Sequence, residues 1–222
     1  MQIHNSLKRL GALWGIVLMT GCATQLPPMD YTAYKESRPR SLLVLPPVNS
    51  TPEVQAPMTV LSYATRPLAE SGYYVIPVTL MAEAFKENGL TQPAEMHAVP
   101  EAKLREIFGA DAALYIDIKK YGTQYLVVDS ATVVAAEAKL VDLKTGKQLW
   151  AGTATASSKE GENNQNSGGL VGLLITAVVK QIVASTTDQS NRIAGIATER
   201  LLSAGQPRGI LFGPRSPHYG KD

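Results

Sequence analysis

The chain has 222 residues, and 45% of them are apolar, which is enough for one folded domain with tails and too many for a wholly disordered protein. Its formal charge is +2, from 21 basic and 19 acidic side chains. Lys8 and Arg9 belong to a leader that we expect to be removed and that contains no acidic residue, so that 19 basic side chains then balance 19 acidic ones. A neutral protein has no electrostatic reason to bind nucleic acid, and we expect no such partner.

Residues 1–21 have the three parts of an export signal peptide. Two basic residues come first, Leu10–Met19 form a short apolar run, and small and polar residues lead to Gly21 and Cys22. The apolar run is shorter than the roughly 20 residues that a membrane-spanning helix needs. Cys22 is the only cysteine, so it cannot form a disulfide within the chain, and its thiol in an exported protein needs another explanation.

The segment from Leu18 to Cys22 (LMTGC) resembles the lipobox of bacterial lipoproteins, with Met19 at a position where that family usually has Leu. The resemblance implies cleavage between Gly21 and Cys22, and a diacylglycerol thioether plus an amide-linked acyl chain on Cys22, which together make a stable anchor. We expect no cofactor besides this covalent lipid. Ala23 follows the cysteine, and by the sorting pattern of the family it implies the outer membrane of a Gram-negative cell. The domain is then expected to face the periplasm, with exposure at the cell surface as the alternative.

The mature chain is predicted to start with a lipidated tether, residues 22–40, in which Pro, charge and Tyr occur without a period. An apolar run at 41–48 predicts a buried strand. Helical spacing at 58–70 predicts a helix that is kinked or restarted by Pro67 and ended by a Ser-Gly pair. Residues 73–77 predict a second strand.

Two more helices are predicted before the next strand. Thr79 is expected as the N-cap of a helix that runs through Asn88, and Pro100 begins a helix that ends at Phe108, before a glycine. After this helix the apolar period changes to two, which is typical of a strand with one solvated face. In this strand Leu114, Ile116 and Ile118 alternate with Tyr115, Asp117 and Lys119.

A β-hairpin is predicted in the C-terminal half of the chain. Residues 130–143 and 148–157 form its strands, and Gly146 supplies the positive φ that the connecting turn requires. With the preceding elements, the hairpin predicts a single α/β or α+β domain over residues 41–204, an open mixed sheet of about five strands packed by helices. The order of the strands cannot be predicted from these patterns.

Leu170–Ala184 is predicted to be a helix with apolar residues nearly all round its circumference. Such a helix is buried on all sides, faces a partner or inserts into a membrane, and the sequence leaves these three possibilities open. The candidate partner-binding residues on its two sides are Leu170, Val171, Leu174, Ile175, Val178, Val179 and Ile182. After it we expect a helix from a Ser190 or Asn191 cap to Leu202, and then an extended or disordered tail, residues 205–222.

Two segments, DAALYIDIKKYG at 111–122 and AEAKLVDLKTGKQLWAGTATA at 136–156, resemble a strand and hairpin of a periplasmic α/β group. That group includes the amino-terminal domain of TolB, the curli secretion lipoprotein CsgG and the penicillin-binding-protein activator LpoB. From Cys22 to about Pro207 the chain is similar to an uncharacterised Gram-negative outer-membrane lipoprotein family that has a neisserial antigen as a member. The resemblance implies a scaffold or accessory lipoprotein of an envelope assembly, which binds other envelope proteins and is often a homodimer or homo-oligomer.

The residues do not indicate catalytic or metal-binding chemistry. His97 and His218 are the only histidines after the leader, and neither has a second histidine at ligand spacing, so we expect no metal site. No segment brings together a base, a nucleophile and an oxyanion site, and we expect no enzymatic activity. In the hairpin, Asp142 and Thr145 are expected to shape the turn and Trp150 to pack.

The sequence supports two functional hypotheses. The first is a lipid-anchored, non-enzymatic accessory or scaffold subunit of a transport, secretion or envelope-maintenance complex. The alternative is a periplasmic module that binds a small molecule or a peptidoglycan fragment, through the strand face with Tyr115, Asp117 and Lys119 or through the loop 159–169. CsgG-like pores have long alternating segments that form a membrane barrel, whereas a short polar loop and an apolar helix are predicted after this hairpin, so we expect no pore.

Overall fold

The computed structural model describes residues 29–125, 130–160 and 186–221. The leader, the predicted cleavage site at Gly21 and the predicted lipidation site at Cys22 lie outside the described residues. The same holds for most of the loop 159–169 and for the predicted apolar helix with its seven candidate partner-binding residues.

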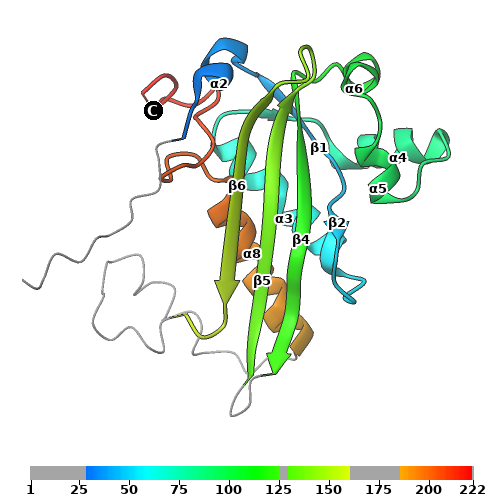
Figure 1. Ribbon diagram of the computed structural model, residues 1–222, viewed down its shortest axis with the longest axis vertical. Helices are drawn as coiled ribbons and strands as arrows, with labels where there is room; N and C mark the ends of the chain where they lie inside the picture. Colours follow the sequence, from blue (N-terminus) through cyan, green and yellow to red (C-terminus); the bar gives the residue numbers. More distant parts are fainter. Residues whose placement is uncertain (1–28, 126–129, 161–185, 222) are drawn as a thin grey trace, which may run out of the picture.

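One open mixed sheet forms the centre of the domain (Figure 1). Its strands are β1 (Ser41–Val44), β2 (Val48–Asn49), β3 (Tyr74–Val75), β4 (Ala112–Tyr125), β5 (Ser130–Asp142) and β6 (Gln148–Ser157). The order is β3-β1-β4-β5-β6, with β1 parallel to both of its neighbours and β5 antiparallel to both β4 and β6. The predicted mixed sheet and hairpin are confirmed. The additional strand β2 pairs with β4 beyond β1, because two prolines without N–H groups interrupt the predicted strand 41–48.

Two helices, α3 (Ala56–Glu70) and α8 (Thr186–Leu202), pack together on one face of the sheet (Figure 1). The face of β4 with the predicted apolar residues Leu114, Ile116 and Ile118 is fully buried. The sequence predicted either a kink or a new helix start at Pro67. Helix α3 continues past Pro67 as one element, which excludes a new start.

The predicted N-cap of the last helix is wrong. Asn191 and Ser190 both lie inside α8, and Ser190 is buried. The Asn191 side-chain oxygen accepts hydrogen bonds from the hydroxyls of Tyr121 on β4 (2.9 Å) and Thr59 on α3 (3.3 Å). A polar side chain that looked like a cap in the sequence therefore joins the two helices to the sheet.

Three short helices lie beside β1 and β4, on the side of the sheet away from β6 (Figure 1): α4 (Val78–Glu87), α5 (Pro93–His97) and α6 (Glu101–Phe108). Gly109, with a φ of 63°, ends α6 as predicted. The prediction for Thr79 is wrong, because α4 begins one residue earlier, after Pro77, and has no side-chain cap. Helix α5 was not predicted, since five residues are too few to show a period.

The two ends of the described chain pack together at one end of the domain. Helix α2 (Thr32–Ser37) lies there beside the C-terminal segment, residues 203–221 (Figure 1). Tyr34 is 3% exposed and donates to the Tyr73 hydroxyl (2.8 Å), because Tyr73 gives its one hydroxyl hydrogen to the Leu211 carbonyl (2.6 Å).

These contacts correct two predicted boundaries. Residues 29–40 are part of the domain and do not form a free tether, and residues 205–221 do not form a free tail, since Ile210 is 2% exposed and the Gly209 carbonyl accepts a hydrogen bond from Tyr31 (2.6 Å). Neither segment shows a period because single tyrosines and backbone groups make the contacts. Among the helices of the described residues, none combines the length and the apolarity that crossing a membrane requires.

Candidate functional site

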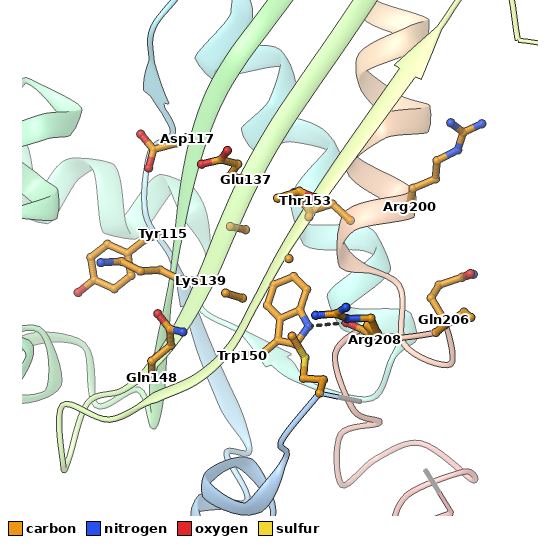
Figure 2. A pocket seen from close by; sticks show the side chains of 17 residues that line it. Tyr115, Asp117, Glu137, Lys139, Gln148, Trp150, Thr153, Arg200, Gln206 and Arg208 are labelled. Atoms are coloured by element: carbon orange, nitrogen blue, oxygen red, sulfur yellow. Dashed lines mark hydrogen bonds between the residues drawn. The ribbon is translucent and has the colours of Figure 1, made fainter. Parts of the chain in front are cut away.

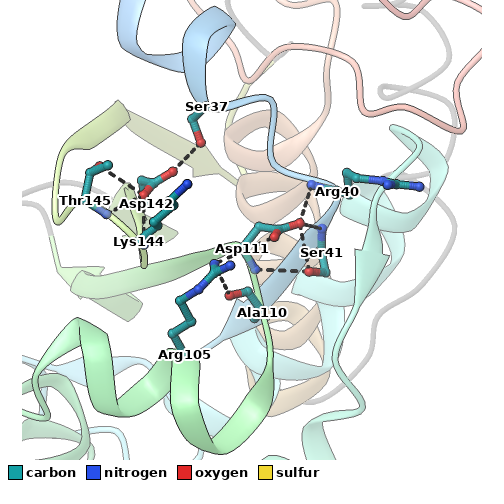
Figure 3. Close-up of polar contacts among 9 residues, drawn as sticks. All are labelled: Ser37, Arg40, Ser41, Arg105, Ala110, Asp111, Asp142, Lys144 and Thr145. Carbon is teal, nitrogen blue, oxygen red and sulfur yellow. Dashed lines mark hydrogen bonds and ion pairs between the residues drawn. The ribbon is translucent and has the colours of Figure 1, made fainter.

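Asp142 holds the turn of the β5–β6 hairpin and joins it to α2 (Figure 3). Its carboxylate accepts hydrogen bonds from the N–H groups of Lys144 (2.8 Å) and Thr145 (2.7 Å) and from the Thr145 hydroxyl (2.9 Å), and one more from the hydroxyl of Ser37. Burial raises the pKa of this carboxyl, but the hydrogen bonds outweigh burial and hold the pKa below its ordinary value. Gly146 has a φ of 71°, as the turn requires. The predicted roles of Asp142 and Thr145 in the turn are confirmed.

Asp111 makes a second junction, between the chain that enters β1 and the start of β4 (Figure 3). Its Oδ2 accepts hydrogen bonds from the N–H groups of Arg40 (2.9 Å) and Ser41 (3.2 Å) and from the Ser41 hydroxyl (3.2 Å). Arg105 Nη1 lies 3.8 Å from its Oδ1. Asp111 and Asp142 are the first aspartates of the two segments 111–122 and 136–156. Both therefore have structural roles.

A groove of about 650 Å³ lies over β4, β5 and β6 and continues round β6 to residues 206–209 (Figure 2). Side chains alternate along strands, so the groove residues of β4 and β5 point away from the face that packs on α3 and α8. We call this feature the sheet groove. Its main polar and aromatic lining residues are Tyr115, Asp117, Glu137, Lys139, Trp150 and Arg200.

One wall of the sheet groove is formed by Tyr115. Its ring is 5% exposed, because His97 packs edge-on against it, with 5.2 Å between ring centroids, and Lys139 Nζ lies 5.0 Å over the ring. Burial, with a smaller contribution from the charge of Glu101, raises the pKa of Tyr115 to about 12, so the phenol is protonated at neutral pH.

His97 supports this wall in its neutral form. Its Nε2 lies 2.9 Å from the Pro46 carbonyl oxygen, which can only accept, so Nε2 carries the hydrogen. Burial is the largest influence on the pKa of His97 and lowers it, against the opposing effects of the Pro46 carbonyl and of Asp117. The ring is thus a neutral donor that joins α5 to the chain after β1.

Two carboxylates lie in the middle of the sheet groove (Figure 2). Asp117 and Glu137 are register partners on β4 and β5, an arrangement in which like charges repel. Lys119 lies at a register shift of β4 and places its Nζ 3.4 Å from Glu137 Oε2, which offsets one of the two charges. Among the residues that the structure describes, no three histidine, cysteine or acidic side chains are grouped so as to hold a metal ion.

Trp150 fills the end of the sheet groove nearest α2. It is 3% exposed, and its Nε1 donates to the Arg208 carbonyl (2.9 Å, Figure 2). The indole lies against Gly152, where an added Cβ would come within 2.2 Å of the ring atom Cζ2. The predicted packing role of Trp150 is confirmed, and its partner is the C-terminal segment.

Strand β6 is the edge of the sheet beside the groove. The Thr155 carbonyl accepts a hydrogen bond from Arg200 of α8 (2.9 Å), so it points away from β5. Backbone groups alternate in direction along a strand, and those of Ala151 and Thr153 therefore also turn outward. The sheet groove thus combines charged and aromatic side chains with a strand edge that can form hydrogen bonds.

The structure brings together part of what the sequence indicated. Tyr115 and Asp117 line the sheet groove as the second hypothesis expected, whereas Lys119 stands at its rim in the ion pair with Glu137. Sequence reasoning missed Glu137, Lys139 and Arg200. The alternation in 130–143 contains the signal for the two residues of β5, but the position of Arg200 depends on how α8 crosses the sheet.

Comparison with known proteins places the chain in a family. A family model described as "Putative lipoprotein GNA1162-like" matches residues 29–215. The lipoprotein NMB1124/NMB1162 of Neisseria meningitidis serogroup B (strain ATCC BAA-335 / MC58) is 48% identical over 204 residues, which are 91% of this chain and 94% of the neisserial one.

A solved structure of a neisserial relative shows the same relationship. The crystal structure of lipoprotein GNA1162 from Neisseria meningitidis covers 64% of this chain and 97% of its own, with 50% identity and a TM-score of 0.53. The C-terminal domain of LpoB from Salmonella enterica is similar over 52% of this chain and 81% of its own, at 20% identity and a TM-score of 0.39. The resemblance to a lipoprotein family with a neisserial member is confirmed, and the chain belongs to the GNA1162-like lipoprotein family.

Proposed function

We propose that the protein is anchored by lipid on Cys22 in the outer membrane of a Gram-negative cell, facing the periplasm. There its domain acts as a non-enzymatic accessory subunit of a transport, secretion or envelope-maintenance complex and docks another envelope protein in the sheet groove. The observation that carries the proposal is the groove itself, which lies beside the outward-turned backbone of β6. Membership of a lipoprotein family supports the anchor.

The lining of the sheet groove favours binding over catalysis. The phenol of Tyr115 stays protonated and the ring of His97 is neutral and donates to a carbonyl, so both groups have structural roles. The edge strand offers N–H and C=O groups with which an extended segment of a partner can pair as a further strand. Charges of both signs in the groove then select which segment fits.

Site-specific crosslinking in cells tests the docking surface. A photoreactive residue in place of the exposed Thr153 in the groove is expected to give a discrete crosslinked species of the full-length protein. The matched control is the exposed Glu87 on α4, away from the groove, where the same residue should give no such species. Equal crosslinking at both positions, or a species that survives Lys139→Glu, would count against the sheet groove.

Fractionation tests the anchor separately. The wild-type protein is expected in the outer-membrane fraction. Cys22→Ser is expected to be absent from that fraction, either held at the inner membrane by its uncleaved signal peptide or soluble in the periplasm if the peptide is cleaved elsewhere. A Cys22→Ser protein that is processed and fractionates like the wild type would contradict lipid attachment. We further propose that the protein forms a homodimer or homo-oligomer, so light scattering on the detergent-extracted protein is expected to give a mass above that of one chain.

A second candidate function is the binding of a small polar ligand or a peptidoglycan fragment in the same groove. The observation in its favour is the pairing of a protonated phenol and an indole with two carboxylates and a lysine. A concentration-dependent rise in melting temperature with a peptidoglycan fragment, abolished by Asp117→Ala, would favour this function over protein docking.

A further inference from the structure

We propose that the α2 end of the domain binds the anionic headgroups of the bilayer that holds the anchor, through an aromatic pocket with a basic rim. The proposal rests on the lipid anchor at Cys22 and concerns how the folded domain is held against the membrane surface.

The position of the chain start determines which end faces the bilayer. Six residues lie between Cys22 and Met29, and the seven residue-to-residue steps of a fully extended chain span at most about 25 Å. Met29 packs against the hydrophobic core, lines the sheet groove together with residues 206–209, and precedes the start of α2 by three positions. Helix α2 and the C-terminal segment lie together at one end of the domain (Figure 1). This end therefore lies close to the membrane surface, whichever path the linking residues take.

A pocket of about 340 Å³ opens at this end. Aromatic side chains from three parts of the chain form its walls: Tyr34 of α2, Tyr73 before β3, and Phe212 and Tyr219 of the C-terminal segment. Tyr219 is 43% exposed. Tyr34 and Tyr73 are buried, and their hydroxyls are hydrogen-bonded within the domain. The exposed Tyr219 is therefore the tyrosine of this pocket that can lie at a lipid headgroup layer, where a ring with a polar tip is favoured.

The rim of the pocket is basic. Lys35 and Arg38 border it, and both are exposed. Arg38 has a φ of 47°, a left-handed conformation that is uncommon for a side-chain-bearing residue, and its Nε donates to the Lys35 carbonyl (3.1 Å). In the part of the chain that the structure describes, neither side chain has a carboxylate within ion-pair distance, so both charges are available to a phosphate.

Further cations extend this basic surface. Arg215 lies 5.3 Å over the ring of Tyr74, whose N–H donates to the Arg40 carbonyl, so these two arginines belong to the same end. Within residues 29–41 and 203–222 there are six basic side chains, namely Lys35, Arg38, Arg40, Arg208, Arg215 and Lys221, against three acidic ones, Asp30, Glu36 and Asp222. The mature chain as a whole is neutral, so positive charge is concentrated where the anchor brings the domain to the bilayer.

Vesicle cosedimentation tests the proposal with the whole mature chain made without lipid, as Cys22→Ser. We expect binding to vesicles of equal parts phosphatidylglycerol and phosphatidylcholine, weaker binding at higher salt, and little binding to phosphatidylcholine alone. The double variant Lys35→Glu, Arg38→Glu should bind the anionic vesicles about ten-fold or more weakly. A control with the same charge change, Lys86→Glu, Lys103→Glu on the exposed surfaces of α4 and α6, should bind like the parent.

Equal loss of binding in both double variants would show a response to net charge alone and would overturn the proposal, as would equal binding to both vesicle types. If the glutamate variant fails to fold, as judged by circular dichroism, Lys35→Gln, Arg38→Gln replaces it with the same expectation. Lipid attachment at Cys22 is tested independently by the fractionation of wild type and Cys22→Ser. A protein that does not bind vesicles can therefore still be a lipoprotein, and a protein that is not lipidated is recognised without the vesicle experiment.

Discussion

Asp142 shows how one side chain holds distant parts of this chain together. Its carboxylate satisfies the hairpin turn on one side and the Ser37 hydroxyl at the end of α2 on the other. Replacing the charged carboxylate by an amide leaves these partly buried donors with a poorer acceptor, and the loss of hydrogen bonds to a charged group costs roughly 1–3 kcal/mol. We therefore expect Asp142→Asn to lower the free energy of unfolding at pH 7 by about that amount, as measured by urea denaturation.

The same carboxyl predicts a pH dependence. Its pKa is lowered in the folded protein, so the unfolded chain, with an Asp pKa of about 3.9, takes up the proton more readily. The stabilisation is complete above that pH and is lost as the pH falls through the folded pKa. The stability difference between wild type and Asp142→Asn should therefore shrink on acidification below about pH 4. Glu87→Gln, exposed on α4, should keep the wild-type profile, and a constant difference at all pH values would refute the argument.

Gly152 is the second residue at which a small change has a defined consequence. A methyl group there would overlap the Trp150 ring, whose Nε1 also holds the C-terminal segment. Gly152→Ala is expected to reduce stability by about 1–3 kcal/mol in urea denaturation. Gly195→Ala in α8 is the matched control: its Cβ would lie 3.2 Å from the ring of Tyr63, which is 41% exposed and can move, while helix propensity favours alanine. A Gly152→Ala protein as stable as the control would show that the indole has room to shift.

The C-terminal segment is an element without regular secondary structure that the fold depends on. Tyr73 donates to the Leu211 carbonyl, and the N–H of Gly213 donates to the Ser71 carbonyl (2.8 Å). Tyr73→Phe should cost about 1–2 kcal/mol and speed hydrogen exchange at Gly213 more than in the strands. Tyr63→Phe, at a more exposed ring, should leave exchange there unchanged. Exchange at Gly213 that is the same in both variants would mean that other contacts hold the segment.

Prediction from sequence succeeded for elements whose contacts are local or periodic. The predicted hairpin strands 130–143 and 148–157 differ from β5 and β6 by a single residue, because alternation and a glycine turn specify both. Helices α2 and α5 have six and five residues and could not be recognised from a period. The caps predicted at Thr79 and Ser190 failed because a hydroxyl residue near a helix start resembles one inside the first turns, and only tertiary contacts distinguish them.

At the scale of the whole molecule, the sequence did not reveal how the strands and the two termini are arranged in space. Strand β1 lies between β3 and β4, an order set by crossovers that carry no signature in the sequence. The sheet groove combines residues of β4, β5 and α8, so Tyr115 and Asp117 could be selected by alternation but Arg200 could not. The basic surface at the α2 end could not be predicted for the same reason, since α2 and residues 203–221 are far apart along the chain and adjacent in space.

Under the proposed attachment, the length of the central strands sets how far the protein would extend from the bilayer. Strand β4 begins beside Asp142 and α2 and continues for 14 residues, which at about 3.3 Å per residue is about 45 Å. The end of β4 and the starts of β5 and α8 lie toward the opposite tip (Figure 1). With α2 at the headgroups, this tip stands off from the lipid by most of that distance. The end of β4 would then be held at a height from which it can meet an assembly in the periplasm.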